Sequence, residues 1–353
     1  MVSELAGCMS KNKQLYLSSR VRLIAVLLMV IPASPTLAQE GADCTPTFEP
    51  STASYDFHRT ELPELGDKKV GQIHVTRLPI FDENDEDENY WLYRLANRIH
   101  YLTQEQNIRE QLLFKEGDAY RTREIQESAR LLRDLGHLYD ANIQTTSTCG
   151  DTVDLEVVTR DVWSLTVDAS FARSGGENDF RLGLGETNLF GTGQKISVFT
   201  EEDDERKSTS FAYQNRNVKG SRVRTKLLIQ DSDDGDQYSG QIFLPFYALD
   251  TRRAWGVTVN QLERVDTQYF RGDDITEVRH DIESMSAYYG FSKGLVNGKA
   301  RRWSLGYRYV EEKFERTIDL PAPTTLPIAK ELSYPFVNLE IVEDNYTTAF
   351  NLD

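Results

Sequence analysis

The chain has 353 residues, of which 40 are Lys or Arg and 56 are Asp or Glu, for a formal net charge of −16. This excess of acidic side chains repels phosphate groups, which argues against nucleic acid as a partner. A hydrophobic content of 39% is too high for a disordered chain, and the length suffices for one domain plus a barrel. Only one stretch is apolar enough to enter a bilayer as a helix, which excludes a polytopic helical membrane protein.

The first 38 residues have the order of a secretory signal peptide. Basic side chains between Lys11 and Arg22 precede the apolar run Leu23–Ile31, and small residues follow up to Ala38. The apolar run is about half as long as a membrane-spanning helix requires. We therefore expect export with cleavage after Ala38, and the alternative is a retained membrane anchor.

Export would place Cys44 and Cys149 in an oxidising compartment, where two thiols of one mature chain often pair. A disulfide between them would tie a polar entry segment, residues 39–67, to the first folded unit. Two independent thiols remain the alternative, because connectivity cannot be read from a sequence.

Residues 68–162 predict a small α+β domain with the order βααββ. The predicted elements are a strand over 71–78, an acidic loop over 82–89, helices over 90–102 and 122–135, and strands over 140–146 and 152–159. The first helix has one apolar stripe at helical spacing, formed by Trp91, Leu92, Leu95, Ile99 and Leu102. Gly136 follows the second helix in the position of a C-cap.

The second half of this domain resembles a POTRA domain. The resemblance lies in Leu113–Tyr120, with its Gly-Asp before the second helix, in the Leu-containing helix, and in Asp134–Ile143, where Leu-Gly leads into a strand. POTRA domains precede outer-membrane barrels of the BamA/TamA type. The resemblance implies exposure to the periplasm and capture of client chains by strand addition to a sheet edge. A generic α+β domain is the alternative.

Residues 163–353 change to a period of two. Leu165, Val167, Ala169 and Phe171, for example, alternate with more polar neighbours. About eleven candidate strands follow this pattern, over 165–172, 181–185, 195–200, 210–214, 222–229, 241–249, 254–263, 285–291, 303–310, 337–341 and 346–352. Turn-rich segments over 174–176, 231–240 and 293–299 separate some of them. The pattern favours an antiparallel transmembrane β-barrel, and a soluble secreted sandwich is the competing interpretation.

The segment Phe180–Gly193 resembles the early hairpin of the BamA/TamA barrel, with an Asn-Leu-Phe-Gly-x-Gly turn. Its glycines lie between two strands with no helix after them, so nucleotide binding does not fit. The family barrel has about 16 strands and a late Val-Arg-Gly-aromatic motif, which this sequence lacks. We therefore expect a C-terminally truncated barrel of 10 or 11 strands, since Asp353 ends what reads as an ongoing strand.

The resemblance implies an outer-membrane protein assembly, insertion or translocation factor of a Gram-negative bacterium. Its partners would be the outer-membrane bilayer, nascent outer-membrane or secreted client polypeptides, and periplasmic chaperones or accessory lipoproteins. It would need no cofactor and no metal, because strand addition makes no covalent bond. The predicted client-contact edges are Asp140, Asn142 and Gln144 in the first unit and Leu165, Val167, Ala169 and Phe171 in the first barrel strand.

Two other classes of function stay open at this stage. One is a passive outer-membrane barrel, a porin or adhesin with a periplasmic domain. The other is an outer-membrane enzyme, which the sequence disfavours. The five histidines fall in different predicted elements, and no Ser/His/Asp arrangement or metal-ligand spacing is present.

Overall fold

The computed structural model describes residues 44–46 and 62–346, except 175, 176, 204, 272, 319, 322 and 324. The predicted signal peptide, most of the polar entry segment and most of the strand predicted over 346–352 lie outside the described residues. Within the described part, no helix is long and apolar enough to cross a membrane.

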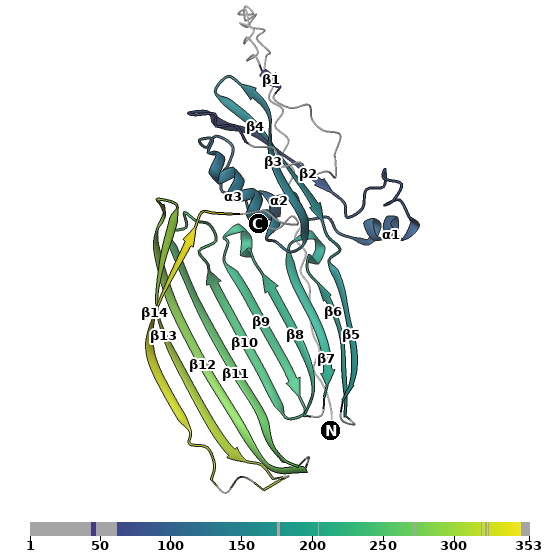
Figure 1. Ribbon diagram of the computed structural model, residues 1–353, viewed down its shortest axis with the longest axis vertical. Coiled ribbons are helices and arrows are strands. Elements are labelled where there is room, and N and C mark those ends of the chain that lie inside the picture. Colours follow the sequence, from purple (N-terminus) through teal and green to yellow (C-terminus); the bar gives the residue numbers. More distant parts are fainter. Residues whose placement is uncertain are drawn as a thin grey trace, which may run out of the picture. The chain divides into compact units, whose positions relative to one another are not determined.

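The first unit is built on a four-stranded sheet with the order β1-β3-β4-β2 (Figure 1). Its strands are β1 (Cys44–Pro46), β2 (Lys69–Leu78), β3 (Leu138–Cys149) and β4 (Thr152–Asp161). Only β2 and β4 run parallel. Three helices, α1 (Trp91–Ile99), α2 (Glu105–Arg109) and α3 (Thr122–Arg133), connect β2 to β3. The predicted order βααββ therefore misses β1 and α2, because elements of three and five residues are too short to show a period.

Helices α2 and α3 supply the core on one face of this sheet. Ile108 of α2 and Ile125 and Leu132 of α3 are fully buried, as are Val153 and Leu155 of β4. The alternation of β4 and the helical spacing of α3 bring these side chains to one interface. The α+β architecture is present, while its assignment as a POTRA domain stays a prediction.

Cys44 and Cys149 form a disulfide in the structure. The two residues also pair in the register of β1 and β3, and they are 105 positions apart in the sequence. The bond therefore holds the short strand β1 against the far end of β3.

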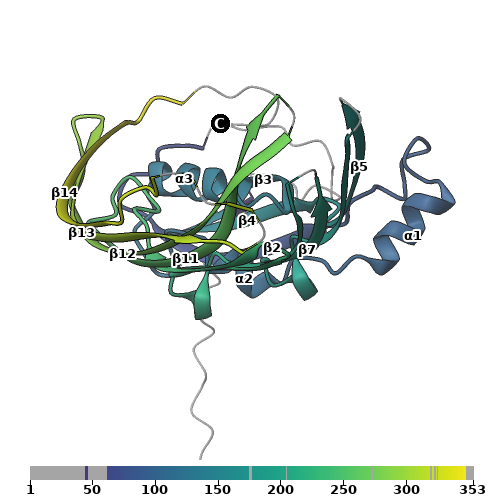
Figure 2. The ribbon, with the colours of Figure 1, turned by 90° about the horizontal axis from the view of Figure 1, so that it is seen from below.

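The second unit is a ten-stranded antiparallel sheet whose strands follow one another in chain order. The strands are β5 (Leu165–Ser174), β6 (Glu177–Glu186), β7 (Gln194–Glu202), β8 (Lys207–Asn215), β9 (Arg224–Ser232), β10 (Gly235–Leu244), β11 (Arg253–Phe270), β12 (Asp273–Val296), β13 (Lys299–Arg316) and β14 (Lys330–Glu343). Figure 2 shows that the sheet is curved. Over the described residues it does not close, so it has the construction of a partial β-barrel.

One face of this sheet is apolar across its width, as the period of two predicts. Val167 of β5 pairs with Leu184 of β6, and Leu184 pairs with Val198 of β7. All three side chains are exposed. On the opposite face, Arg181 forms ion pairs with neighbouring carboxylates, which keeps the charges away from the apolar side.

The apolar band has the height expected of a membrane-spanning sheet. On β12 it runs from Met285 to Phe291, roughly 20 Å of strand, close to the ~25 Å band of outer-membrane barrels. Glu283 follows on the same face and pairs with Glu311 of β13, so the face becomes charged beyond the band. The sequence alternation therefore marked only the apolar part of these strands. For that reason the predicted spans of β11, β12 and β13 were too short.

Two of the predicted turns are also much shorter in the structure. The expected turn over 231–240 is reduced to Asp233 and Asp234, with β9 and β10 on either side. The turn over 293–299 is reduced to Asn297 and Gly298, which both have positive φ, as tight hairpins require. The polar residues at these strand ends resemble a loop in the sequence because they lie beyond the apolar band.

Candidate functional site: two strand edges and the polar junction between the sheets

The first predicted contact edge, on β5, is an edge strand of the sheet. Strand β5 pairs with β6 along its whole length and has no strand on its other side among the described residues. Leu165, Val167, Ala169 and Phe171 share one face, and Val167 and Phe171 are 67% and 68% exposed. Strand β5 thus combines an open backbone edge with an apolar, outward-facing side-chain row.

The second predicted edge, on β3, is partly capped by its own chain. Strand β4 pairs with one side of β3, and on the other side β1 covers only Ser147–Cys149, so most of that outer side has no described strand. At Ala141, however, the backbone N–H donates to Asp140 Oδ1 (2.7 Å), and the carbonyl accepts from Arg133 Nη1 of α3 (2.8 Å). A strand that added to β3 at this point would have to displace both contacts. This part of the edge is therefore protected against strand addition.

The three predicted side chains on β3 do not form one surface. Asp140 is buried at 1% exposure beside a register shift, whereas Asn142 and Gln144 are half-buried. The amide of Gln144 donates to Glu156 Oε2 (3.0 Å), and Thr76 donates to the other oxygen of Glu156 (2.6 Å). These side chains join β2, β4 and β3 into one sheet. Sequence alternation could not reveal that they have internal partners.

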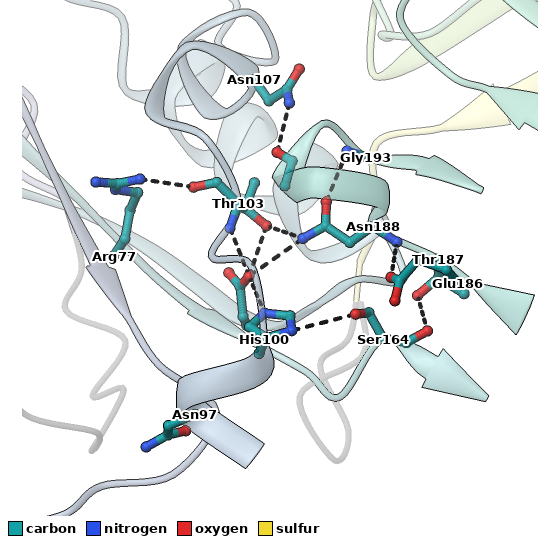
Figure 3. A network of polar contacts seen from close by, with 12 residues as sticks. Arg77, Asn97, His100, Thr103, Asn107, Ser164, Glu186, Thr187, Asn188 and Gly193 are labelled. Carbon is teal, nitrogen blue, oxygen red and sulfur yellow. Dashed lines mark hydrogen bonds and ion pairs between the residues drawn. The ribbon is translucent and has the colours of Figure 1, made fainter. Parts of the chain in front are cut away.

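A buried carboxylate joins the first unit to the ten-stranded sheet (Figure 3). Asp161, the last residue of β4, accepts at Oδ2 from Thr103 N (2.8 Å), Thr103 Oγ1 (3.0 Å) and His100 Nε2 (2.8 Å). Asn188, which follows β6, donates to the same Thr103 hydroxyl (2.9 Å). Asp161, Thr103 and Asn188 are each at most 1% exposed. Three segments distant in sequence, namely residues 100–103, the end of β4 and the turn after β6, therefore meet at this junction.

The turn that follows Asn188 is shaped by that same side chain. Its Oδ1 accepts from the N–H of Gly193 (2.8 Å), which closes the turn around a short 3-10 helix, Leu189–Gly191. Gly191 has a φ of +73°, and a Cβ there would lie 2.3 Å from the carbonyl oxygen of Leu102. The Gly191 carbonyl in turn accepts from Gln104 N (2.8 Å). Glycine is required here because the turn touches the first unit through its backbone.

A second turn of the sheet repeats this construction. Asn217 Oδ1 accepts from Arg222 N (2.9 Å), around a 3-10 helix over Val218–Gly220. Asn217 Nδ2 also contacts the first unit, donating to Glu110 Oε2 (2.7 Å). The recurrence of Asn-x-x-Gly followed by Thr or Ser at 188–192 and 217–221 is the sequence signal for this junction.

A third turn, between β10 and β11, contacts α3. The buried Glu127 accepts from Leu249 N (2.6 Å), and Arg123 forms an ion pair with Asp250. Burial raises the pKa of Glu127, while the backbone donor and nearby Arg130 lower it. All three turns lie at the same end of the sheet, so the first unit is attached to that end by polar contacts.

We expect Asn188→Ala to destabilise the refolded chain by about 1–3 kcal/mol, because the Thr103 hydroxyl and the Gly193 N–H lose their buried partner. Urea unfolding of the full chain in detergent micelles measures this. Asn178→Ala, at an exposed position of β6, is the matched control and should change little. Equal effects of the two variants would contradict a bridging role for Asn188.

The part of the chain that the structure describes has no cluster of metal-ligating side chains. In that part, no group of three or more His, Cys, Asp or Glu side chains is arranged to hold a metal ion. The junction and the two strand edges are therefore the candidate functional features.

No known protein family and no curated protein matches the sequence. Among solved structures, the chain is similar to BamA from Haemophilus ducreyi lacking POTRA domains 1–3, with a TM-score of 0.36 and 12% identity over 71% of this chain. It is also similar to CdiB from Acinetobacter baumannii, with a TM-score of 0.30 and 13% identity over 87% of this chain. The chain spans 57% of the length of the BamA structure and 74% of the CdiB structure. A BamA is thus among the structures it is similar to, as the resemblance in the sequence predicts.

Proposed function

We propose that the chain is an outer-membrane assembly or translocation factor that receives client β-strands on the open edge of β5. The observation that carries this proposal is a ten-stranded sheet with one apolar face and an edge strand without a described partner on its outer side. In hydrocarbon, each unpaired backbone group costs several kcal/mol. An incoming strand would satisfy those groups, so the edge itself favours strand addition.

Strand β5 is a better template than β14 or β3. Pro335 lies within β14 and cannot donate a backbone hydrogen bond, whereas β5 contains no proline. The edge of β3 is capped at Ala141 by Asp140 and Arg133. We therefore assign client contact to Leu165–Phe171, and a lesser role to β3.

In this proposal, residues 1–38 direct export, residues 68–162 form a POTRA-like domain in the periplasm, and residues 163–353 lie in the outer membrane. The order of basic, apolar and small residues before Ala38 supports the export signal. The apolar band supports insertion of the sheet in a bilayer. The partners would be the bilayer and nascent outer-membrane or secreted polypeptides, with chaperones or accessory lipoproteins delivering them.

Proline substitution along β5 tests the proposal, because neighbouring residues of an edge strand donate to opposite sides. One series replaces Val167 or Ala169 and the other replaces Asp168 or Ser170. One series must remove backbone N–H groups of β5 that donate to β6. The other series must remove only N–H groups on the side of β5 that has no described partner, and we call it the open-side series. We expect the open-side series to leave folding intact but to lower client assembly by about tenfold or more, since each lost donor also brings a steric clash.

Folding is followed by the heat-dependent gel mobility of the refolded sheet, and activity by assembly of a model outer-membrane protein into liposomes. Leu182→Pro, in the interior strand β6, is the control that should prevent folding. Full assembly activity in folded variants of the open-side series would overturn the proposal. Ion conductance without any effect on clients would instead identify a passive barrel.

A further inference from the structure

Helix α1 presents its apolar side outward. Trp91, Leu92, Leu95 and Ile99 are 65%, 55%, 43% and 55% exposed, and none of the nine residues of the helix is buried. The sequence predicts this stripe correctly, but the stripe joins no core in the described part of the chain. Exposed apolar surface of this extent on one helix indicates an interaction site.

The opposite side of α1 is the side attached to the protein. Asn97 accepts from Phe81 N (3.1 Å) and donates to Phe81 O (2.9 Å), and the ring of Tyr93 stacks on Phe81 at 4.2 Å. At about 100° per residue, the four apolar side chains span an arc of about 100°, centred opposite Tyr93 and Asn97. The helix is therefore held in an orientation that keeps the apolar arc away from its own domain.

The apolar arc continues onto the apolar face of the ten-stranded sheet. Ile99 and Tyr101 line one hollow together with Trp163, Leu165 and Phe190. The ring of Tyr101 meets that of Phe190 edge to face, with centroids 5.6 Å apart. Leu165 begins the outward-facing row of β5. A partner that covers the apolar arc of α1 must therefore also contact the end of β5.

The composition of this surface is that of a membrane–water boundary. Trp91, Tyr101 and Trp163 are exposed aromatic side chains with a polar atom, the kind enriched at headgroup level. Arg94 and Arg98 lie along one border of the arc, where their stems can cover apolar surface while the charges reach lipid phosphates.

We propose that α1 lies in the interfacial layer of the lipid bilayer beside β5 and anchors the first unit to the membrane surface. This inference rests on the proposed function in one respect, namely that the apolar face of the sheet contacts lipid. The acidic loop over 82–89 directly precedes α1, so binding depends on apolar area and does not require anionic lipid.

Tryptophan quenching by brominated phosphatidylcholine tests this anchor in the full chain, refolded into vesicles. One variant retains only Trp91 and a second retains only Trp303, which lies in the apolar band of β13; the other tryptophans become Phe. We expect bromine near the headgroups to quench Trp91 about twofold or more, and deeply placed bromine to quench it less. Trp303 should also be quenched, since it reports insertion of the sheet.

Leu95→Glu in the Trp91-only chain should abolish most of the Trp91 quenching. The same change in the Trp303-only chain should leave quenching of Trp303 unchanged. Gln126→Glu, at an exposed position of α3, adds the same charge elsewhere and serves as the matched control. Quenching of Trp303 without Trp91 would overturn the anchor while leaving the inserted sheet intact. Absence of quenching at both positions would overturn insertion of the sheet and, with it, the proposed function.

Discussion

Replacement of Asp161 by alanine is expected to destabilise the refolded chain by about 3–5 kcal/mol, the largest effect of any single polar side chain described above. The carboxylate is 1% exposed and accepts from the backbone and hydroxyl of Thr103 and from His100. Its removal leaves three buried donors without their acceptor, and each lost partner carries a desolvation penalty.

The loss should also loosen the first unit from the ten-stranded sheet, because Asn188 contacts the first unit through Thr103, which Asp161 positions. Urea unfolding of the full chain in micelles gives the free energy, and protease cleavage between β4 and β5 reports the loosening. The Asp161→Asn side chain keeps one acceptor oxygen, so this variant should lose less free energy of unfolding than Asp161→Ala. Asp87→Ala, in the exposed acidic loop, is the control. If the Asp161→Ala chain were as stable as this control, Asp161 would not be the residue that stabilises the junction.

The second large expected effect is a pH dependence of the stability of the folded chain, caused by His137. Burial lowers the pKa of this imidazole from 6.5 to about 4, with Arg216 adding to the decrease and Asp161 opposing it. Its buried Nε2 has no hydrogen-bond partner in the described part, and its ring packs against Gly193 of the first junction turn. The folded protein therefore holds His137 neutral where the unfolded chain would protonate it.

The sign of the effect follows from proton binding. Between about pH 4 and 6.5 the unfolded state binds the additional proton, so stability rises with pH across this window. The contribution of His137 is complete above about pH 6.5 and is lost as the pH falls toward 4, by about 3 kcal/mol in total. Protonation would act at the contact between His137 and Gly193, hence at the junction.

His137→Phe should remove this part of the pH dependence while it keeps a ring in the site. Free energies of unfolding of the full chain, measured at half-unit steps from pH 4 to pH 7, test the prediction. His74→Phe, at an exposed position of β2, is the matched control for the substitution itself. Identical slopes in wild type and His137→Phe would show that His137 does not titrate in this window.

Local patterns in the sequence were sufficient for much of the fold. The period of two predicted an antiparallel sheet with apolar and polar faces, because successive side chains of a strand point to opposite sides. The helical spacing of Ile125, Ala129 and Leu132 predicted α3 and its buried face. The elements missed were α2 and β1, which are too short to repeat a period, and the charged extensions of β11 to β13.

The outcome for α1 shows the limit of this reasoning. Its spacing predicted an amphipathic helix, but spacing cannot say on which side the protein lies. Asn97 and Tyr93 decide that through their contacts with Phe81, a residue outside the helix. The capping of Ala141 by Arg133 was equally invisible, because it depends on how α3 packs against β3.

The sequence by itself determined which face of the longer strands and helices is apolar, since that property depends only on the local period. The tertiary structure alone decided which surfaces remain open and which polar groups meet. Asp161, Thr103 and Asn188 come together only when β4, the segment after α1 and the turn after β6 are all in place. The donors to the Asp161 carboxylate come from His100 and Thr103, which lie far from it in the sequence, so no local pattern around Asp161 could reveal them.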